Sequence, residues 1–208
     1  MMKKTLLIAL SMMLSLLASA QTDALSVFRS RVLDSCVEFT YDFEAGLTTK
    51  LCGSGKAVLQ GECFSVVGNG LDIKCDGKVV WTVDRGAKEA LVESLEVDGA
   101  NNIYANPALF ITYMAESFTV KSQARATFAG KNCVKAVLLP KIKGDLAEII
   151  LYLSVDGNCL YGAETKVKDG TVTKFTIPSF SFVEKKPLSV FTVSESSFDK
   201  SYIITDLR

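Results

Sequence analysis

The fold is decided by the stretch from Gly53 to Leu95, which reads GSGKAVLQGECFSVVGNGLDIKCDGKVVWTVDRGAKEALVESL. Apolar residues recur at every second position within its short runs: Val58, Phe64, Val66, Leu71, Ile73, Val79, Trp81 and Val83. A spacing of two places side chains on one face of a β-sheet. The turns Gly68-Asn69-Gly70 and Asp76-Gly77 separate these runs, and their Asn and Gly residues tolerate the positive φ that hairpins require. The stretch therefore predicts three or four strands in a continuous meander that curls over an apolar interior.

The sequence before this stretch predicts one helix and two strands. Apolar residues recur at helical spacing over 23–35, with Thr22 or Asp23 as the N-cap. From Val37 to Phe43, apolar and polar residues alternate, which indicates a strand with one buried face and one wet face. A second strand is expected over 47–59, and another follows the meander over 88–96.

After a loop at 98–102, a second helix interrupts the β pattern. Asn106 is its predicted N-cap, Pro107 is its predicted first residue, and the helix ends near Phe118. Strands are then expected over 118–128, 132–140, 147–155, 158–168 and 171–182, and a short one over 202–204 follows an irregular segment. These elements predict a mainly β (α+β) fold with one strongly curved antiparallel sheet. Its interior is either filled by side chains or open to a ligand.

The first 20 residues have the pattern of a cleavable signal peptide. Lys3 and Lys4 precede an apolar run over 5–17, and Ala18-Ser19-Ala20 supplies the small residues for cleavage before Gln21. A transmembrane anchor is the alternative, but the run is shorter than the roughly 20 residues that a bilayer span needs. A lipoprotein signal would need Cys in place of Gln21. We therefore expect a soluble exported protein with a single domain over 21–208.

Charge and composition argue against nucleic-acid binding and catalysis. Lys and Arg number 23, Asp and Glu also number 23, and there is no basic patch that would neutralise phosphates. The chain has no histidine, the commonest general base, and no G-x-S-x-G motif. It also lacks a C-x-x-C motif, so no metal site is expected. We expect a binding protein without a cofactor rather than an enzyme.

Six cysteines follow the signal peptide, and an even count in an exported protein suggests disulfides. Their spacing suggests three pairs, each across a hairpin: Cys36 with Cys52, Cys63 with Cys75, and Cys133 with Cys159. The midpoints of these pairs are Glu44, Asn69 and Leu146. The alternative is six free thiols that act as small apolar core residues.

A family resemblance rests on three ordered pieces of the chain: GECFSV at 61–66, LDIKCDGKVVW at 71–81, and the tail at 197–208 with SF and ITDLR. Together they resemble the outer-membrane lipoprotein carrier family, LolA, over most of the chain after residue 22. The resemblance implies an incomplete β-barrel whose open side is covered by helices, with the helix that ends near Phe118 as part of the lid. It also implies a periplasmic chaperone, expected to be a monomer. This chaperone would accept acylated lipoproteins from an inner-membrane ABC release complex, shield their acyl chains, and pass them to an outer-membrane acceptor.

The resemblance further implies which residues bind lipid. By position, the sheet would contribute Val37, Phe39, Phe64, Val66, Ile73 and Trp81, and the lid would contribute Leu109, Phe110, Tyr113 and Met114. For any one of these residues, the alternative is a place in a filled core. The chain departs from the family at one position. The better-known carriers have an Arg-Pro pair whose arginine latches the lid, and this chain has Gln60-Gly61 in its place.

Two other functions stay open at the level of sequence. The same half-barrel could serve as a lipid-binding sensor or regulatory domain, with a protein partner and no transfer activity. A filled β-sandwich that acts as a structural or adhesion module is the third reading, and it predicts a solid interior without retained lipid.

Overall fold

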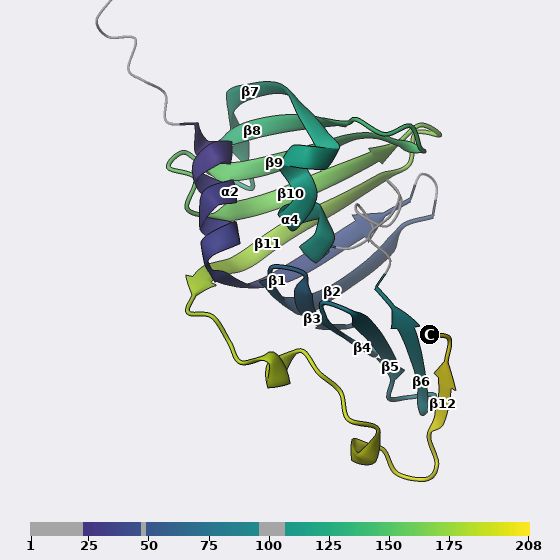
Figure 1. Ribbon diagram of the computed structural model, residues 1–208. Coiled ribbons are helices and arrows are strands. Elements are labelled where there is room, and N and C mark those ends of the chain that lie inside the picture. Colours follow the sequence, from purple (N-terminus) through teal and green to yellow (C-terminus); the bar gives the residue numbers. More distant parts are fainter. Residues whose placement is uncertain (1–22, 47–48, 96–106) are drawn as a thin grey trace, which may run out of the picture.

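A computed structural model describes residues 23–46, 49–95 and 107–208 (Figure 1). Within these residues, twelve strands form one sheet in the order β12-β6-β5-β4-β3-β2-β1-β11-β10-β9-β8-β7. Neighbouring strands run antiparallel, apart from β12, which runs parallel to β6. The sheet is strongly curved and is not closed into a barrel, and α2 and α4 lie on its concave face (Figure 1). The predicted fold class is therefore confirmed.

The N-terminal half of the chain forms the predicted first helix and the meander. Asp23 caps the helix, as predicted, because its carboxylate accepts a hydrogen bond from the Ser26 N–H at 3.2 Å. Asn69 and Gly70 have positive φ angles of 53° and 83° at the predicted turn. The elements are α2 (Ala24–Asp34), β1 (Cys36–Ala45), β2 (Leu51–Gln60), β3 (Cys63–Gly68), β4 (Leu71–Asp76), β5 (Val79–Asp84) and β6 (Glu89–Ser94).

The C-terminal half adds a second helix, five strands and a returning segment. Pro107 begins this helix, as predicted, whereas the predicted N-cap Asn106, the predicted loop at 98–102 and the predicted signal peptide lie outside the described residues. After the last long strand, the chain returns to the far edge of the sheet, where it adds a final strand (Figure 1). The elements are α4 (Pro107–Ser117), β7 (Phe118–Phe128), β8 (Lys131–Pro140), β9 (Leu146–Ser154), β10 (Leu160–Val167), β11 (Val172–Val183), the short 3-10 turns η1 (Leu188–Val190) and η2 (Glu195–Ser197), and β12 (Ile203–Asp206).

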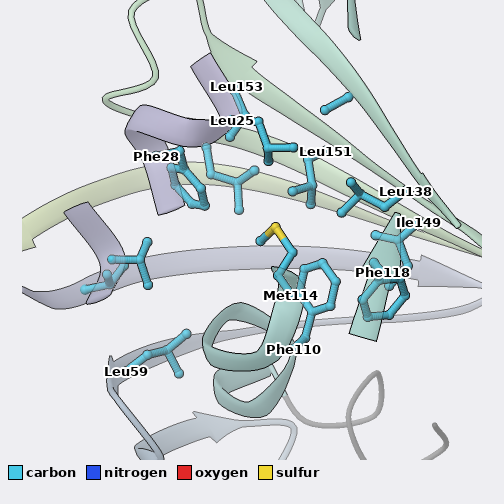
Figure 2. Close-up of a cluster of buried hydrophobic side chains, with 14 of the residues drawn as sticks. Leu25, Phe28, Leu59, Phe110, Met114, Phe118, Leu138, Ile149, Leu151 and Leu153 are labelled. Carbon is cyan, nitrogen blue, oxygen red and sulfur yellow. The ribbon is translucent and has the colours of Figure 1, made fainter. Parts of the chain in front are cut away.

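The main apolar core lies on the concave face, between the sheet and the two helices. Phe28 of α2 and Met114 of α4 reach into it from opposite sides and meet strand residues such as Leu151 (Figure 2). The helices therefore fill this part of the concave face with their own side chains.

The convex face carries two smaller apolar clusters. One surrounds Trp81 and Val92 and is covered by Val193, Phe198 and Tyr202 of the returning segment, residues 184–202. The other gathers residues of β7, β8 and β9: Phe128, Cys133, Ile150 and Tyr152. The returning segment thus attaches to the sheet from the outside.

All six cysteines are free, and the strand register contradicts the predicted pairing of Cys36 with Cys52. β1 continues to Ala45, which lies opposite Leu51, so the hairpin is centred further along the chain than Glu44. Cys52 consequently lies opposite Glu44, eight positions along β1 from Cys36. At the rise of a strand this separates the two thiols by roughly 26 Å, whereas a disulfide needs Cα atoms within about 7 Å.

The other two predicted pairs are also wrong. Cys75 lies opposite Phe64, so the neighbouring Cys63 points to the other face of the sheet. Cys133 lies on β8 and Cys159 precedes β10, and β9 runs between these strands, which separates the two residues by about 10 Å. Burial raises the pKa of the Cys75 thiol to about 11, so this residue behaves as a small apolar core residue.

Candidate functional site

Aromatic side chains form a continuous row on the concave face, along the seam between β1 and β11. Contacting rings within this row have centroids 5.1 to 6.5 Å apart. Every member is only partly buried. The aromatic row consists of Phe39, Tyr41, Phe43, Phe175, Phe180 and Phe182.

A bulge in β11 brings the whole row onto one face. Phe39 lies opposite Phe180. Phe43 lies opposite Phe175, so four steps along β1 match five steps along β11. The extra residue lies next to Pro178, which has no N–H to donate and is tolerated at bulges. Because of this bulge, Phe175 and Phe180 share the concave face, although they are five residues apart in β11.

Two glycines of β2 make room for rings of the aromatic row. Gly55 lies opposite Tyr41, and a Cβ at this glycine would stand 2.6 Å from Tyr41 Oη. Gly53 lies opposite Phe43, and a Cβ there would stand 2.6 Å from Phe43 Cε1. Both rings therefore reach over β2 and take the places of the absent side chains, which widens the aromatic surface.

Helix α2 covers one end of the aromatic row. The buried Phe28 ring lies 5.7 Å from the Phe180 ring and 6.1 Å from the Phe182 ring. The guanidinium carbon of Arg31 lies 4.2 Å from the centroid of Phe182, in the range of a cation–π contact. The row thus begins beneath α2 and continues along β1 and β11 away from it.

Five of the sheet residues predicted to bind lipid lie on the concave face. Val37 and Phe64 are packed into the core there, and Phe64 has only 4% of its surface exposed. Phe39, Val66 and Ile73 are partly buried against the same core. Val37 and Phe64 thus belong to the filled part of the interior, and Phe39 belongs to the aromatic row.

The prediction that Trp81 lines the same face is wrong. Ile73 lies opposite Thr82, whereas Trp81 lies opposite Lys74, so the indole points to the convex face. There it stacks on Phe198 with ring centroids 5.9 Å apart and lines a recess of about 360 Å³ next to the returning segment. A spacing of two holds within one strand, but it does not determine which residues of two strands share a face.

The predicted lid residues lie on α4. Phe110 and Met114 are buried in the concave core (Figure 2), while the side chain of Leu109 is not among those that the structure describes. Tyr113 is partly buried, and its phenol donates a hydrogen bond to the carboxylate of Glu62 in the β2–β3 turn. This hydrogen bond is the main cause that raises the pKa of Tyr113 to about 12. Helix α4 is therefore packed down on the sheet and tied to one of its turns.

Gln60, the residue in place of the family's arginine, makes a different contact. Its side-chain amide donates to the Lys186 carbonyl at 3.1 Å and accepts from the Lys186 N–H at 2.7 Å. Gln60 thus anchors the start of the returning segment to the end of β2. The bond from Tyr113 to Glu62 joins α4 to the same turn two residues further on.

The chemistry of the aromatic row is that of an apolar binding surface. Burial raises the pKa of Tyr41, so its phenol stays neutral. Within the described part of the chain, no group of three or more Cys, Asp and Glu side chains is arranged to hold a metal ion. No helix among the described residues combines the length and apolar character needed to cross a bilayer.

Comparisons with known proteins find similarity in structure alone. No family model and no curated protein match the chain. An uncharacterized conserved protein from Thermus thermophilus has a TM-score of 0.55 at 11% identity, over 88% of this chain and 97% of that chain. A LolA superfamily protein from Nitrosomonas europaea has a TM-score of 0.42 at 10% identity, over 82% and 97%. A putative outer membrane lipoprotein-sorting protein domain from Vibrio parahaemolyticus has a TM-score of 0.43 at 10% identity, over 80% and 95%.

At such low identity, the likeness to the Thermus thermophilus protein is one of fold. The sheet of this chain is curved and open, and its concave face carries both described helices (Figure 1). This is the architecture that the resemblance to the lipoprotein carriers implied. The chain therefore has the predicted fold class, a curved and open sheet with helices on its concave face.

Proposed function

We propose that this protein is an exported carrier that binds the acyl chains of lipoproteins on its aromatic row. In this proposal, the signal peptide directs the chain to the periplasm. The mature protein then takes acylated lipoproteins from an inner-membrane ABC release complex and delivers them to an outer-membrane acceptor.

One observation carries the proposal: the aromatic row is apolar, continuous and only partly buried. Rings that served stability alone would be covered by other side chains. A contiguous apolar surface that stays accessible on a concave face marks a binding site for an apolar group. Acyl chains fit this surface because they need a long apolar track and no charged partner.

The energetics favour a surface that holds acyl chains from one side. Enclosing about 40 methylenes, the scale of a multiply acylated anchor, would give roughly 30 kcal/mol relative to water at ~0.8 kcal/mol each. Non-covalent affinities stop near about 18–21 kcal/mol, and a carrier must also release its cargo. Partial contact along the aromatic row would keep binding within this limit.

Loading would also involve α4. Phe110 and Met114 fill the concave face next to the strands, so a larger cargo needs the space that these side chains occupy. We propose that α4 moves away from the sheet when acyl chains enter, and that the closed position is the empty state. A ligand shifts such an equilibrium only by its difference in affinity for the two states.

The test is the release of an acylated lipoprotein from inner-membrane vesicles by the purified protein. Tyr41→Glu places a carboxylate within the aromatic row, and we expect it to lower release at least tenfold. Val67→Glu is the matched control, because Val67 is a half-exposed apolar residue on the convex face of β3. Thermal unfolding of both variants checks that each remains folded.

Other results would support the other functions. A protein that binds acyl chains but releases no lipoprotein, and that captures a protein ligand instead, would be a regulatory sensor. A protein that neither binds acyl chains nor releases lipoprotein would be a filled structural module, and the carrier proposal would be wrong.

A further inference from the structure

The final strand, β12, presents an unusual edge to solvent. It is held to β6 through its backbone, since Ile203 N–H donates to the Lys88 carbonyl at 3.0 Å and Leu207 N–H donates to the Val92 carbonyl at 2.9 Å. All four of its side chains are exposed, and Ile203 has 64% of its surface open. Leu207, directly after the strand, is 63% exposed. Large apolar side chains at an open edge are what other chains pair with.

The opposite edge of the sheet is protected in a way that β12 is not. The outer strand there is β7, whose register is broken by a bulge between Val120 and Ser122. Lys121 lies at this bulge and Arg125 follows on the same strand. Bulges and basic side chains both hinder pairing with a further strand. In β12 the register with β6 is unbroken, and its one charged side chain, Asp206, is ion-paired with Arg208 just beyond the strand at 2.6 Å.

The backbone of β12 dictates how a further strand could pair with it. N–H and C=O groups alternate along a strand, and those of Ile203 and Leu207 point toward β6, so those of Ile204 and Asp206 point outward. An antiparallel second copy must therefore pair through these two residues. Three arrangements are allowed, with the two-fold axis at Ile204, at Thr205 or at Asp206.

Side-chain chemistry selects among the three arrangements. An axis at Asp206 would place Leu207 opposite the partner's Thr205, without an apolar contact, and would bring the two Asp206–Arg208 ion pairs together. An axis at Ile204 would place Leu207 opposite the partner's Ser201 and leave it without an apolar contact. An axis at Thr205 places Ile203 opposite the partner's Leu207, twice by symmetry. In this arrangement the most exposed apolar side chains of the edge cover one another.

We infer that β12 is a self-association edge, on which two copies of this chain pair antiparallel about Thr205. The occupant is a second copy because the edge is complementary to itself, as a two-fold contact requires. After loss of the predicted signal peptide with Lys3 and Lys4, 21 basic and 23 acidic residues remain, so only a small net charge opposes the contact. This inference departs from the expected monomer, because the sequence alone did not indicate that the last strand would be an open edge.

Sedimentation velocity of the purified protein tests the inference over about 10 to 500 µM, since an edge contact of this size is weak. We expect reversible dimers in the wild type and a monomer for Ile203→Asp, which places a carboxylate opposite the partner's Leu207. Leu51→Asp is the matched control, because Leu51 is 66% exposed on β2, away from this edge, and we expect it to dimerise like the wild type.

A cysteine placed on the two-fold axis gives a second, independent readout. Opposed residues of a non-hydrogen-bonded antiparallel pair lie close enough for a disulfide. With the exposed Cys52 changed to Ser as background, Thr205→Cys should form a covalent dimer under mild oxidation faster than Val120→Cys on the protected edge. A wild type that stays monomeric over the whole range, an Ile203→Asp variant that dimerises unchanged, or equal cross-linking at both edges would each overturn the inference.

Discussion

The Tyr113 phenol donates a hydrogen bond to the Glu62 carboxylate, and this bond joins α4 to a turn 51 residues earlier in the chain. Glu62 lies in the β2–β3 turn, two residues after Gln60. Gln60 takes the place of the arginine that latches the lid in the better-known carriers. The proposed movement of α4 must break the hydrogen bond from Tyr113 to Glu62.

Removing this hydrogen bond should loosen α4 without unfolding the sheet. For Tyr113→Phe we expect the amides of α4 to exchange hydrogen about tenfold faster, since a bond to a charged group contributes ~1.5 kcal/mol. Hydrogen exchange followed by mass spectrometry measures this. Tyr161→Phe is the matched control, because Tyr161 packs with the convex cluster. Unchanged exchange in α4 would show that the bond does not hold the helix.

Acid should weaken the turn between β9 and β10. Hydrogen bonds from the Ser154 hydroxyl, and then from Asn158, lower the pKa of Asp156 to about 2. The folded state thus favours the carboxylate, so the stabilisation is present above the ordinary pKa of 3.8 and is lost as the pH falls toward 2. We expect Asp156→Asn to destabilise the protein at pH 6 and to have a clearly smaller effect at pH 2.5, where part of the stabilisation is already lost, measured by urea unfolding. An effect that does not change with pH would contradict this assignment.

Filling the space under the aromatic row should be costly. In Gly55→Ala, the new Cβ would stand 2.6 Å from both Tyr41 Oη and the Val67 carbonyl oxygen. Overpacking of this kind costs about 1–3 kcal/mol in the free energy of unfolding. The control is Gly86→Ala, whose Cβ would meet its nearest neighbour, Asp84 Oδ1, at 3.3 Å. Equal unfolding energies for the two variants would mean that both the Tyr41 ring and the Val67 backbone move aside freely.

Trp81→Ala should affect stability but not acyl binding. The indole stacks on Phe198 on the convex face, and losing a buried Trp side chain costs about 3–5 kcal/mol. Hydrogen exchange should increase in the returning segment, while the affinity for a fluorescent fatty acid stays unchanged in the folded fraction. A large loss of affinity with an undisturbed returning segment would restore the original assignment of Trp81 to the concave face.

Local sequence signals predicted the elements well. The Asp23 cap, the start of α4 at Pro107 and the turn at Asn69 each depend on a few neighbouring residues, and all three positions were predicted. The strand at 118–128 was predicted with both ends correct, because Phe118 and Phe128 bound a clear run between a helix and a turn.

Relations between strands could not be predicted in the same way. The disulfide between Cys36 and Cys52 required the hairpin to be centred at Glu44, and a shift of a few residues separated the thiols. Phe175 and Phe180 are an odd number of residues apart, so in a regular strand their side chains would point to opposite faces of the sheet. A spacing of two therefore could not place both in the aromatic row. The bulge near Pro178 that unites them depends on the pairing of β11 with β1, which only the folded sheet defines.

The most direct test of the carrier proposal is photo-cross-linking with a fatty acid that carries a diazirine on its acyl chain, followed by peptide mapping. We expect cross-links concentrated in β1 and β11, at the peptides that contain Tyr41 and Phe175, and competition by an unlabelled acylated lipoprotein. Cross-links confined to the convex face or the returning segment, or none above the background of an unrelated protein, would contradict it.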